Sequence, residues 1–154
     1  MNQSISVSAA KVQDIPALCR LLEILFFQEA EFHADIAIQR RGLNEIIANP
    51  TIGKILIARS NADIVGMVNL LFSISTALGG KVAWLEDMVI HPDWRNQGIG
   101  SELLETALEQ CRREGLKRIT LLTDADNQAA QRFYRKHGFS ESSMLPMRCL
   151  LENE

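Results

Sequence analysis

The hydrophobic pattern of the chain changes several times between a strand period and a helical period. Residues 5–10 alternate weakly and predict a first strand. Apolar positions three and four apart then predict a helix, which Asp14 and Pro16 open. A second helix continues to about Asn49, where the following proline disfavours helical backbone. The N-terminal third of the chain therefore predicts the order β-α-α.

The middle of the chain is rich in Ile, Val and Leu and predicts three strands in succession. Residues 54–60 and 64–75 are joined by an Asn-Ala-Asp turn, and residues 82–90 follow a Gly-Gly turn. A meander of this kind pairs neighbouring strands antiparallel, with one face of the sheet on the core.

The C-terminal third of the chain alternates between helix and strand. An amphipathic helix ends at Gly115, a strand follows at residues 118–123, a short helix occupies residues 127–137, and a final strand region covers residues 139–150. The whole order is β-α-α-β-β-β-α-β-α-β. It predicts a single α/β (α+β) domain over residues 1–154, with a mixed, largely antiparallel sheet of about six to seven strands and helices on both faces.

Composition narrows the class of protein. The 154 residues are 47% hydrophobic, and 16 Lys and Arg stand against 19 Asp and Glu, a balance that argues against a nucleic-acid partner. No stretch approaches the roughly 18 apolar residues of a membrane span. The N-terminus has no secretory pattern, so we expect a cytoplasmic protein. Cys19, Cys111 and Cys149 lie far apart in the sequence, so neither a disulfide framework nor a metal site is expected.

The most informative segment bears two glycines and lies between the strand at 82–90 and the helix after it. It reads Arg95, Asn96, Gln97, Gly98, Ile99, Gly100 and Ser101. The glycines remove Cβ atoms where backbone N–H groups approach an anion, and the helix start adds unpaired amides and a positive dipole end. A Rossmann loop would need glycine at Leu103, and an NTPase loop would need Gly-Lys-Ser/Thr. The segment predicts a phosphate-binding loop, although a ligand-free turn into a helix shows the same short pattern.

Two motifs in this order resemble the core of the GNAT superfamily of N-acetyltransferases. Arg-x-x-Gly-x-Gly follows a strand that ends in Leu-Glu-Asp-Met-Val-Ile-His-Pro, and residues 126–139 follow at the spacing this family uses. The similarity runs from about Trp84 to Phe139. It implies a GNAT-like fold, with acetyl-CoA as the acyl-donor cosubstrate and no metal. The implied reaction is transfer of an acetyl group to a primary amine of a small molecule or peptide, by direct attack in a ternary complex.

The resemblance also implies roles for coenzyme-binding residues. Backbone groups of Met88, Val89 and Ile90 would pair with the pantetheine arm like an added strand. The amides of residues 95–101 would hold the pyrophosphate. Asn127 would bond the pantetheine or shape the start of its helix, and an ordinary helix cap explains this residue equally well.

Two side chains are candidates for proton transfer. The resemblance makes Tyr134 the donor to the departing thiolate, and a phenol of pKa about 10 suits a thiol of about 8.5. An alkyl ammonium must lose a proton before attack, and Glu86 stands where some family members carry the carboxylate that accepts it. Strand alternation puts Glu86 on one face with Trp84 and Met88, and Asp87 on the other face with Leu85 and Val89. Packing for Tyr134 and a structural role for Glu86 are the competing interpretations, and Asp87 or a water relay remains an alternative base.

The acceptor and the partners are less constrained. Specificity in the family comes largely from segments that match residues 18–49 and 76–81, where Glu29, Glu31 and Asp35 would suit a cationic amine. A coenzyme A-binding regulatory module without turnover and a protein N-terminal or lysine acetyltransferase are the competing functions. The presence of both Glu86 and Tyr134 counts against the first. A hydrophobic C-terminal strand could pair at an exposed edge, which favours a homodimer.

Overall fold

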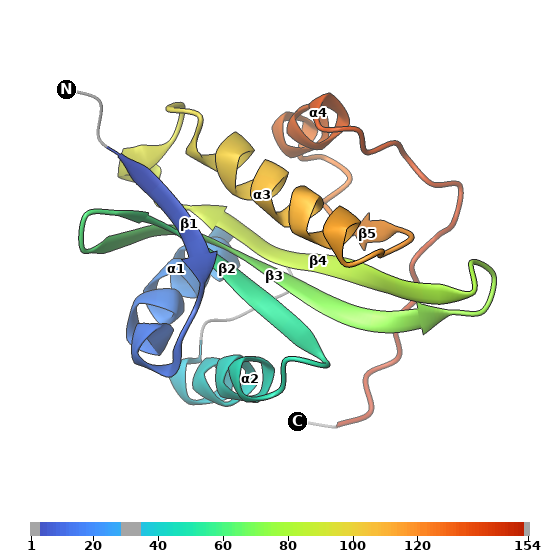
Figure 1. The fold of residues 1–154 in the computed structure, drawn as a ribbon, viewed down its shortest axis with the longest axis horizontal. Helices are drawn as coiled ribbons and strands as arrows, with labels where there is room; N and C mark the ends of the chain where they lie inside the picture. Colours follow the sequence, from blue (N-terminus) through green and yellow to red (C-terminus); the bar gives the residue numbers. More distant parts are fainter. Residues whose placement is uncertain (1–3, 29–34, 153–154) are drawn as a thin grey trace.

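Five strands form one open sheet in the computed structural model, which describes residues 4–28 and 35–152 (Figure 1). Their spatial order is β1-β2-β3-β4-β5. The first four pair antiparallel in sequence, and β5 pairs parallel with β4. The strands are β1 (Ile5–Ala9), β2 (Gly53–Ser60), β3 (Asp63–Ser75), β4 (Gly80–Ile90) and β5 (Ile119–Leu121).

Helices cover both faces of this sheet. In Figure 1, α1 and α2 lie on one side, and α3 and α4 lie on the other. The crossover through α3 is what allows β5 to run parallel to β4, because a tight turn can join only antiparallel strands. The helices are α1 (Ile15–Gln28), α2 (Ile36–Ala48), α3 (Ile99–Arg113) and α4 (Gln128–Lys136).

Each face of the sheet has its own buried cluster. On the α3 side, Leu103 and Leu104 are fully buried against Leu56, Val68 and Leu70 of the sheet. A second cluster, on the α1 side, joins the apolar stripe of α1 to the other face of β2, β3 and β4 through Leu18, Leu22, Ile57, Met67 and Val89. The apolar stripes of α1 and α3 are therefore the faces that pack on the sheet. None of the helices in the described ranges is long and apolar enough to cross a membrane.

The predicted mixed, largely antiparallel sheet with helices on both faces is confirmed, but its strand count is wrong. The described residues contain five strands, fewer than the predicted six to seven. The missing strand is the region at 139–150, which has no regular secondary structure. A strand is held by hydrogen bonds to a neighbour, and this segment pairs with none of the five strands.

A bulge in β4 changes which residues share a face. Asn69 of β3 pairs with Glu86, and Met67 pairs with Val89, so Asp87 and Met88 together lie opposite the one β3 residue between. Asp87 takes the left-handed conformation, with φ 53°. The extra residue reverses the alternation beyond Glu86.

The faces predicted for the residues around the bulge were therefore partly wrong. Leu85 and Met88 pack toward α3, whereas Val89 packs toward α1. Glu86 thus does not share a face with Met88, and Asp87 does not share one with both Leu85 and Val89.

Candidate active site

An opening between β4 and β5 is the first feature of the site. The two strands pair only from Ala83 with Ile119 to Leu85 with Leu121, where β5 ends. β4 continues to Ile90, so Met88, Val89 and Ile90 all lie in a stretch whose β5 side has no strand beside it. An extended ligand could add its own hydrogen bonds to such an edge.

The glycine-bearing loop connects this stretch to α3. Its entry is fixed by Arg95, whose Nε donates to the carbonyl oxygen of Ile90 at 3.0 Å. The residues from Arg95 to Gly98 are exposed, with Asn96 at φ 61° and Gly98 at φ 81°. The α3 ladder begins where the N–H of Glu102 donates to Gly98 at 3.0 Å. The N–H groups of the preceding residues are thus the helix-terminal donors that suit an anion.

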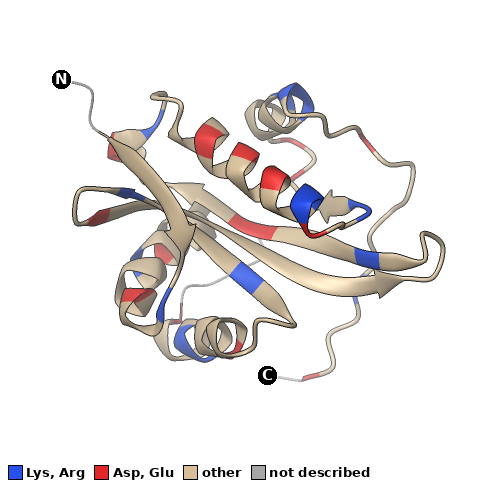
Figure 2. Ribbon diagram, in the orientation of Figure 1, with Lys and Arg blue, Asp and Glu red and all other residues tan. Residues whose placement is uncertain are grey.

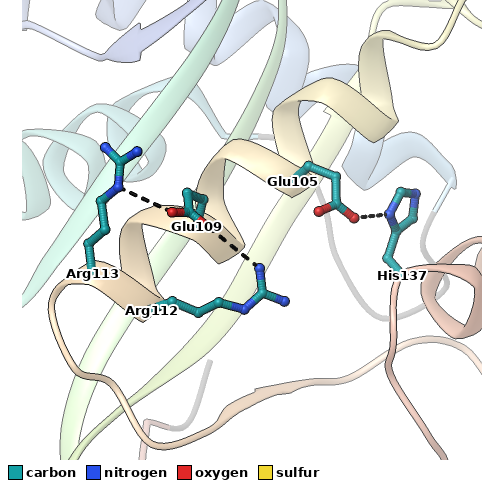
Figure 3. Close-up of polar contacts among 5 residues, drawn as sticks. All are labelled: Glu105, Glu109, Arg112, Arg113 and His137. Carbon is teal, nitrogen blue, oxygen red and sulfur yellow. Dashed lines mark hydrogen bonds and ion pairs between the residues drawn. The ribbon is translucent and has the colours of Figure 1, made fainter.

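A chain of polar contacts links the start of α3 to the end of α4. Ser101 Oγ lies 3.1 Å from His137 Nε2. On the other side of the ring, His137 Nδ1 lies 2.5 Å from Glu105 Oε1, the contact drawn in Figure 3. The imidazole is only 7% exposed. In the tautomer with hydrogen on Nδ1, the ring donates to the Glu105 carboxylate and accepts a hydrogen bond from the Ser101 hydroxyl at Nε2. The last residue of the predicted phosphate loop is therefore connected to α4.

The contacts of His137 with Ser101 and Glu105 could be predicted only in part from the sequence. Ser101 and Glu105 are four residues apart and so share one face of α3. Nothing local placed His137 opposite that face, because the approach of α4 to α3 is a tertiary feature.

α4 brings Tyr134 against the cluster that flanks the opening. Tyr134 is half-buried and contacts Phe133 and Phe139 edge to face, with ring centroids 5.3 and 5.6 Å apart. These rings pack on the same cluster as Met88 and Leu121. Asn127 caps the helix, because its side chain accepts from the N–H of Ala130 at 3.1 Å. Its predicted contact with a coenzyme stays a prediction.

Two adjacent carboxyl groups lie on the α1 side of β4, where Figure 2 shows an acidic stretch in mid-strand. Glu86 lies directly opposite Asn69 on the neighbouring strand and is exposed. The amide Nδ2 of that same Asn69 donates to Asp87 Oδ2 at 3.3 Å. The bulge therefore brings both carboxylates to one side, whereas alternation predicted opposite faces. Trp84, two residues before Glu86, is 41% exposed.

Burial changes the acidity of the inner carboxyl group. It raises the pKa of Asp87 to about 6, the Asn69 hydrogen bond opposes this rise, and the charge of Glu86 adds to it. The positive φ of Asp87 is a second sign of a special position, since strained residues gather at functional sites.

The three acidic residues predicted to suit a cationic acceptor are not among the carboxyl groups of β4. Glu29 and Glu31 lie outside the described residues. Asp35 caps α2, since its side chain accepts from the N–H of Ile38 at 3.2 Å. Within ranges 4–28 and 35–152, no three His, Cys, Asp or Glu side chains gather as metal ligands do.

An open sheet with a gap beside β4, a helix start with unpaired N–H groups and a half-buried tyrosine agree with the α/β architecture of N-acetyltransferases. The chain belongs to the acetyltransferase (GNAT) family, whose profile matches residues 16–139. This match covers both predicted motifs and most of the sheet.

Individual relatives agree with this family. The chain is 28% identical over 133 residues to the aminoalkylphosphonate N-acetyltransferase of Salmonella typhimurium, covering 86% of this chain and 83% of that one. It is 30% identical over 96 residues to an uncharacterized N-acetyltransferase of Bacillus subtilis, covering 62% of this chain and 64% of that protein's length. The crystal structure of an integron cassette protein from the Cole Harbour salt marsh metagenome superposes with a TM-score of 0.83 at 25% identity, covering 96% and 91% of the two chains.

The backbone of the loop gives a first prediction. Gly98→Ala should lower the free energy of unfolding by about 1–2 kcal/mol, because a Cβ disfavours left-handed backbone. No atom within 4 Å would obstruct that Cβ, so the cost is conformational. Gly42→Ala in α2 is the matched control, also without a contact within 4 Å, and should raise stability by about 0.5–1 kcal/mol. Urea unfolding measures both, and a Gly98→Ala protein as stable as the wild type would contradict the assigned conformation.

Proposed function

We propose that this protein transfers an acetyl group from acetyl-CoA to a primary amine of a small molecule or peptide, by direct attack in a ternary complex. The observation that carries the proposal is the continuity of two features. The open stretch of β4 leads directly into the exposed loop at the start of α3. An extended arm with a diphosphate at one end matches that arrangement, and family membership supports it.

The coenzyme would bind along these two features. Main-chain groups of Met88, Val89 and Ile90 would pair with the amide-bearing pantetheine arm. Residues 95–101 (Arg95, Asn96, Gln97, Gly98, Ile99, Gly100 and Ser101) would hold the pyrophosphate with backbone N–H groups. Asn127 would help to position the pantetheine from the start of α4.

The carboxyl pair on β4 would prepare the acceptor. An alkyl ammonium of pKa about 10.4 loses its proton at pH 7 at a cost of roughly 4.6 kcal/mol, from about 3.4 pH units. Glu86 would accept this proton directly or through water, since it is exposed on the strand that lines the opening. Asp87 lies beside it and would add negative charge that attracts the ammonium ion. Tyr134 would return a proton to the coenzyme sulfur as the amide forms.

The same residues favour a cationic acceptor. Trp84, with its exposed ring, Glu86 and Asp87 lie within four consecutive residues of β4. Carboxylates and indole both attract an ammonium group. The Salmonella relative is named for an aminoalkyl substrate, so small aliphatic amines head the candidates. The free thiols of Cys19, Cys111 and Cys149 suit a reducing compartment, and we place the protein in the cytoplasm on that basis.

The proposal is tested by release of free thiol from acetyl-CoA across polyamines, amino sugars, aminoalkylphosphonates, amino acids and N-terminal peptides. We expect release that depends on an acceptor, with the acetylated amine confirmed by mass spectrometry. Binding of acetyl-CoA without turnover on any acceptor would instead favour the coenzyme-binding regulatory module. A preference for peptides over small amines would favour a protein acetyltransferase.

His137 gives a second prediction, as a positioning residue for the phosphate loop. His137→Ala should raise the KM for acetyl-CoA by about tenfold with kcat less affected, because loss of a hydrogen bond to a charged group costs roughly 1.5–3 kcal/mol. The substitution leaves Ser101 and Glu105 without the ring between them. Steady-state kinetics at varied concentrations of acetyl-CoA measures the effects on KM and on kcat separately.

The control for His137 lies on α3, the helix that carries its partners Ser101 and Glu105. Glu109 pairs with Arg112 and Arg113 on the surface (Figure 3), and such exposed pairs contribute little. Glu109→Gln should therefore leave both constants unchanged. Equal effects of the two substitutions would show that His137 does not position the phosphate loop.

A further inference from the structure

Asn69 is a buried amide beside the two carboxyl groups of β4. It lies in β3, directly opposite Ile55 of β2 on one side and Glu86 of β4 on the other. Only 2% of the residue is exposed. Its neighbours Ile55 and Met67, on the same face of the sheet, are apolar and buried. A polar side chain in such a place normally has hydrogen-bond partners for its polar atoms.

The two polar atoms of this amide have different surroundings. Nδ2 donates to Asp87 Oδ2 at 3.3 Å, whereas Oδ1 is buried without a hydrogen-bond partner among the residues that the structure describes. The reverse orientation of the amide would place its oxygen against the carboxylate, so the observed one suits an ionised Asp87. Because both atoms belong to one small planar group, the unpartnered oxygen lies beside the Asp87 carboxylate.

An unsatisfied acceptor at this position favours a functional explanation. A buried carbonyl oxygen without a donor destabilises the fold more than an apolar side chain of the same shape would. Leucine has that shape, so a position that served packing alone would be more stable with leucine. An N–H group supplied by a bound molecule would satisfy the oxygen and remove this cost.

We propose that Asn69 Oδ1 accepts a hydrogen bond from the nitrogen of the acceptor and thereby makes the site specific for an unsubstituted primary amine. The inference rests on the proposed acetyl transfer and adds a residue of β3 to acceptor recognition. Glu86 takes one proton of the ammonium ion. The two N–H groups that remain donate to Asp87 and to Asn69, which fixes the direction of the lone pair for attack.

The proton balance of the transfer agrees with this arrangement. The lone pair forms the C–N bond to the acetyl carbon as the C–S bond of the thioester breaks. One of the two remaining protons then leaves the nitrogen for water, and Tyr134 supplies a proton to the coenzyme sulfur. The product amide keeps a single N–H group and so can satisfy only one of the two acceptors, Asp87 and Asn69. The product is therefore held less well than the amine.

A secondary amine cannot satisfy the same arrangement. Once it is neutral, an N-methyl amine has one N–H group for two acceptors, and its methyl group must lie against one of them. A site that hydrogen-bonds an N–H group of its substrate discriminates against analogues that lack this group, because its own polar atom is then left unpaired. We expect kcat/KM of the wild type to be about 10–100-fold higher for a primary amine than for its N-methyl derivative.

The first test compares these two acceptors in the wild type and in Asn69→Leu, with the primary amine that the acceptor panel identifies. The substitution keeps the shape of the side chain and removes both polar atoms. The kcat/KM for the primary amine should fall by about 10–100-fold, and the preference for it should shrink below about threefold. The KM for acetyl-CoA should not change. Ile55→Val, directly opposite on β2, is the packing control and should keep the preference.

The second test separates recognition of the amine from the contact with Asp87. Asn69→Asp keeps an oxygen acceptor but removes the N–H donor. In both variants the rise of kcat/KM with pH should move to higher pH, because burial and the charge of Glu86 still raise the pKa of Asp87 while the hydrogen bond that lowered it is lost. Above that rise, Asn69→Asp should retain the preference for the primary amine. Loss of the preference in both variants would show that Asn69 acts only through Asp87, and would overturn the proposal.

The remaining outcomes distinguish this inference from the proposed function. Urea unfolding checks that each variant is folded, and Asn69→Ser, which also removes the amide, replaces Asn69→Leu if the latter does not fold. Turnover by the wild type without a preference for the primary amine overturns the inference alone, and so does a preference that survives the loss of the amide. A wild type that binds acetyl-CoA and acetylates no amine overturns both the function and the inference.

Discussion

Glu86→Gln is expected to lower kcat/KM by about 10²–10⁴-fold at pH 8, the range for loss of a positioned general base. The substitution preserves size and removes only the charge that would accept the ammonium proton. Because the side chain is exposed, the fold should be unaffected. The measurement is thiol release with the best acceptor found in the panel. Glu23→Gln, an exposed change of the same kind on α1, is the control and should retain wild-type activity.

The neighbouring carboxyl group should set the pH dependence of this step. Asp87 must be ionised to attract the ammonium ion, and its pKa is raised to about 6 by burial. The wild-type kcat/KM should therefore rise with pH through about 6 and then level off. Asp87→Asn should remove this rise and lower the plateau less than Glu86→Gln does. If Asp87→Asn abolishes activity while Glu86→Gln retains it, the proton acceptor is Asp87.

Stability gives an independent check on the same group. Folding raises the pKa of Asp87 above its ordinary value of 3.8, so protonated Asp87 stabilises the folded state. The contribution is fully present below pH 3.8. This contribution is lost as pH rises through about 6. Asp87→Asn should therefore gain stability relative to the wild type between pH 4 and pH 8, by on the order of 2–3 kcal/mol. A constant difference across that range would mean that the environment of Asp87 does not perturb its ionisation.

The parts of the fold that depend on local chemistry could be predicted from the sequence. The glycine-bearing loop and the helix that follows it were predicted from neighbouring residues, and Gly98 stands at the start of α3. The apolar stripe of α3 likewise packs on the sheet as its spacing predicts. Each of these features depends on a few consecutive residues, which a single sequence records.

Features that depend on a partner across the fold could not be predicted in this way. The bulge at Asp87 becomes visible only when β4 is aligned with Asn69 and Met67 of β3. An acidic residue tolerates the left-handed conformation there, but nothing in the surrounding Val- and Leu-rich run indicates it. The final strand was predicted from apolar residues that are present, but a strand also needs an edge to pair with.

The consequence of the bulge is chemical. Strict alternation would leave one carboxylate facing the acceptor and bury the other on the α3 side, among the leucines of that helix. With the bulge, Glu86 and Asp87 share the side of Asn69, and one exposed carboxylate sits next to one whose pKa is raised. The acid limb of the rate profile therefore follows the raised pKa of Asp87, about 6.

Tyr134→Phe is expected to lower kcat by about 10²–10⁴-fold with little change in the KM for acetyl-CoA, since it removes only the proton donor. The ring keeps its edge-to-face contacts with Phe133 and Phe139, so packing on the cluster beside β4 is retained. The free energy of unfolding should change by no more than about 1–1.5 kcal/mol, the usual contribution of one hydroxyl hydrogen bond. Steady-state kinetics and urea unfolding of the same preparation measure both quantities.

The control for Tyr134 separates proton donation from packing. Phe139→Leu alters the aromatic contact from the other side and removes no acidic group. It should lower stability by about 1 kcal/mol while kcat falls much less than in Tyr134→Phe. If Tyr134→Phe has the wild-type kcat, the hydroxyl does not serve the leaving thiolate. The residue would then act through its ring, and proton return to the coenzyme sulfur would fall to water in the opening between β4 and β5.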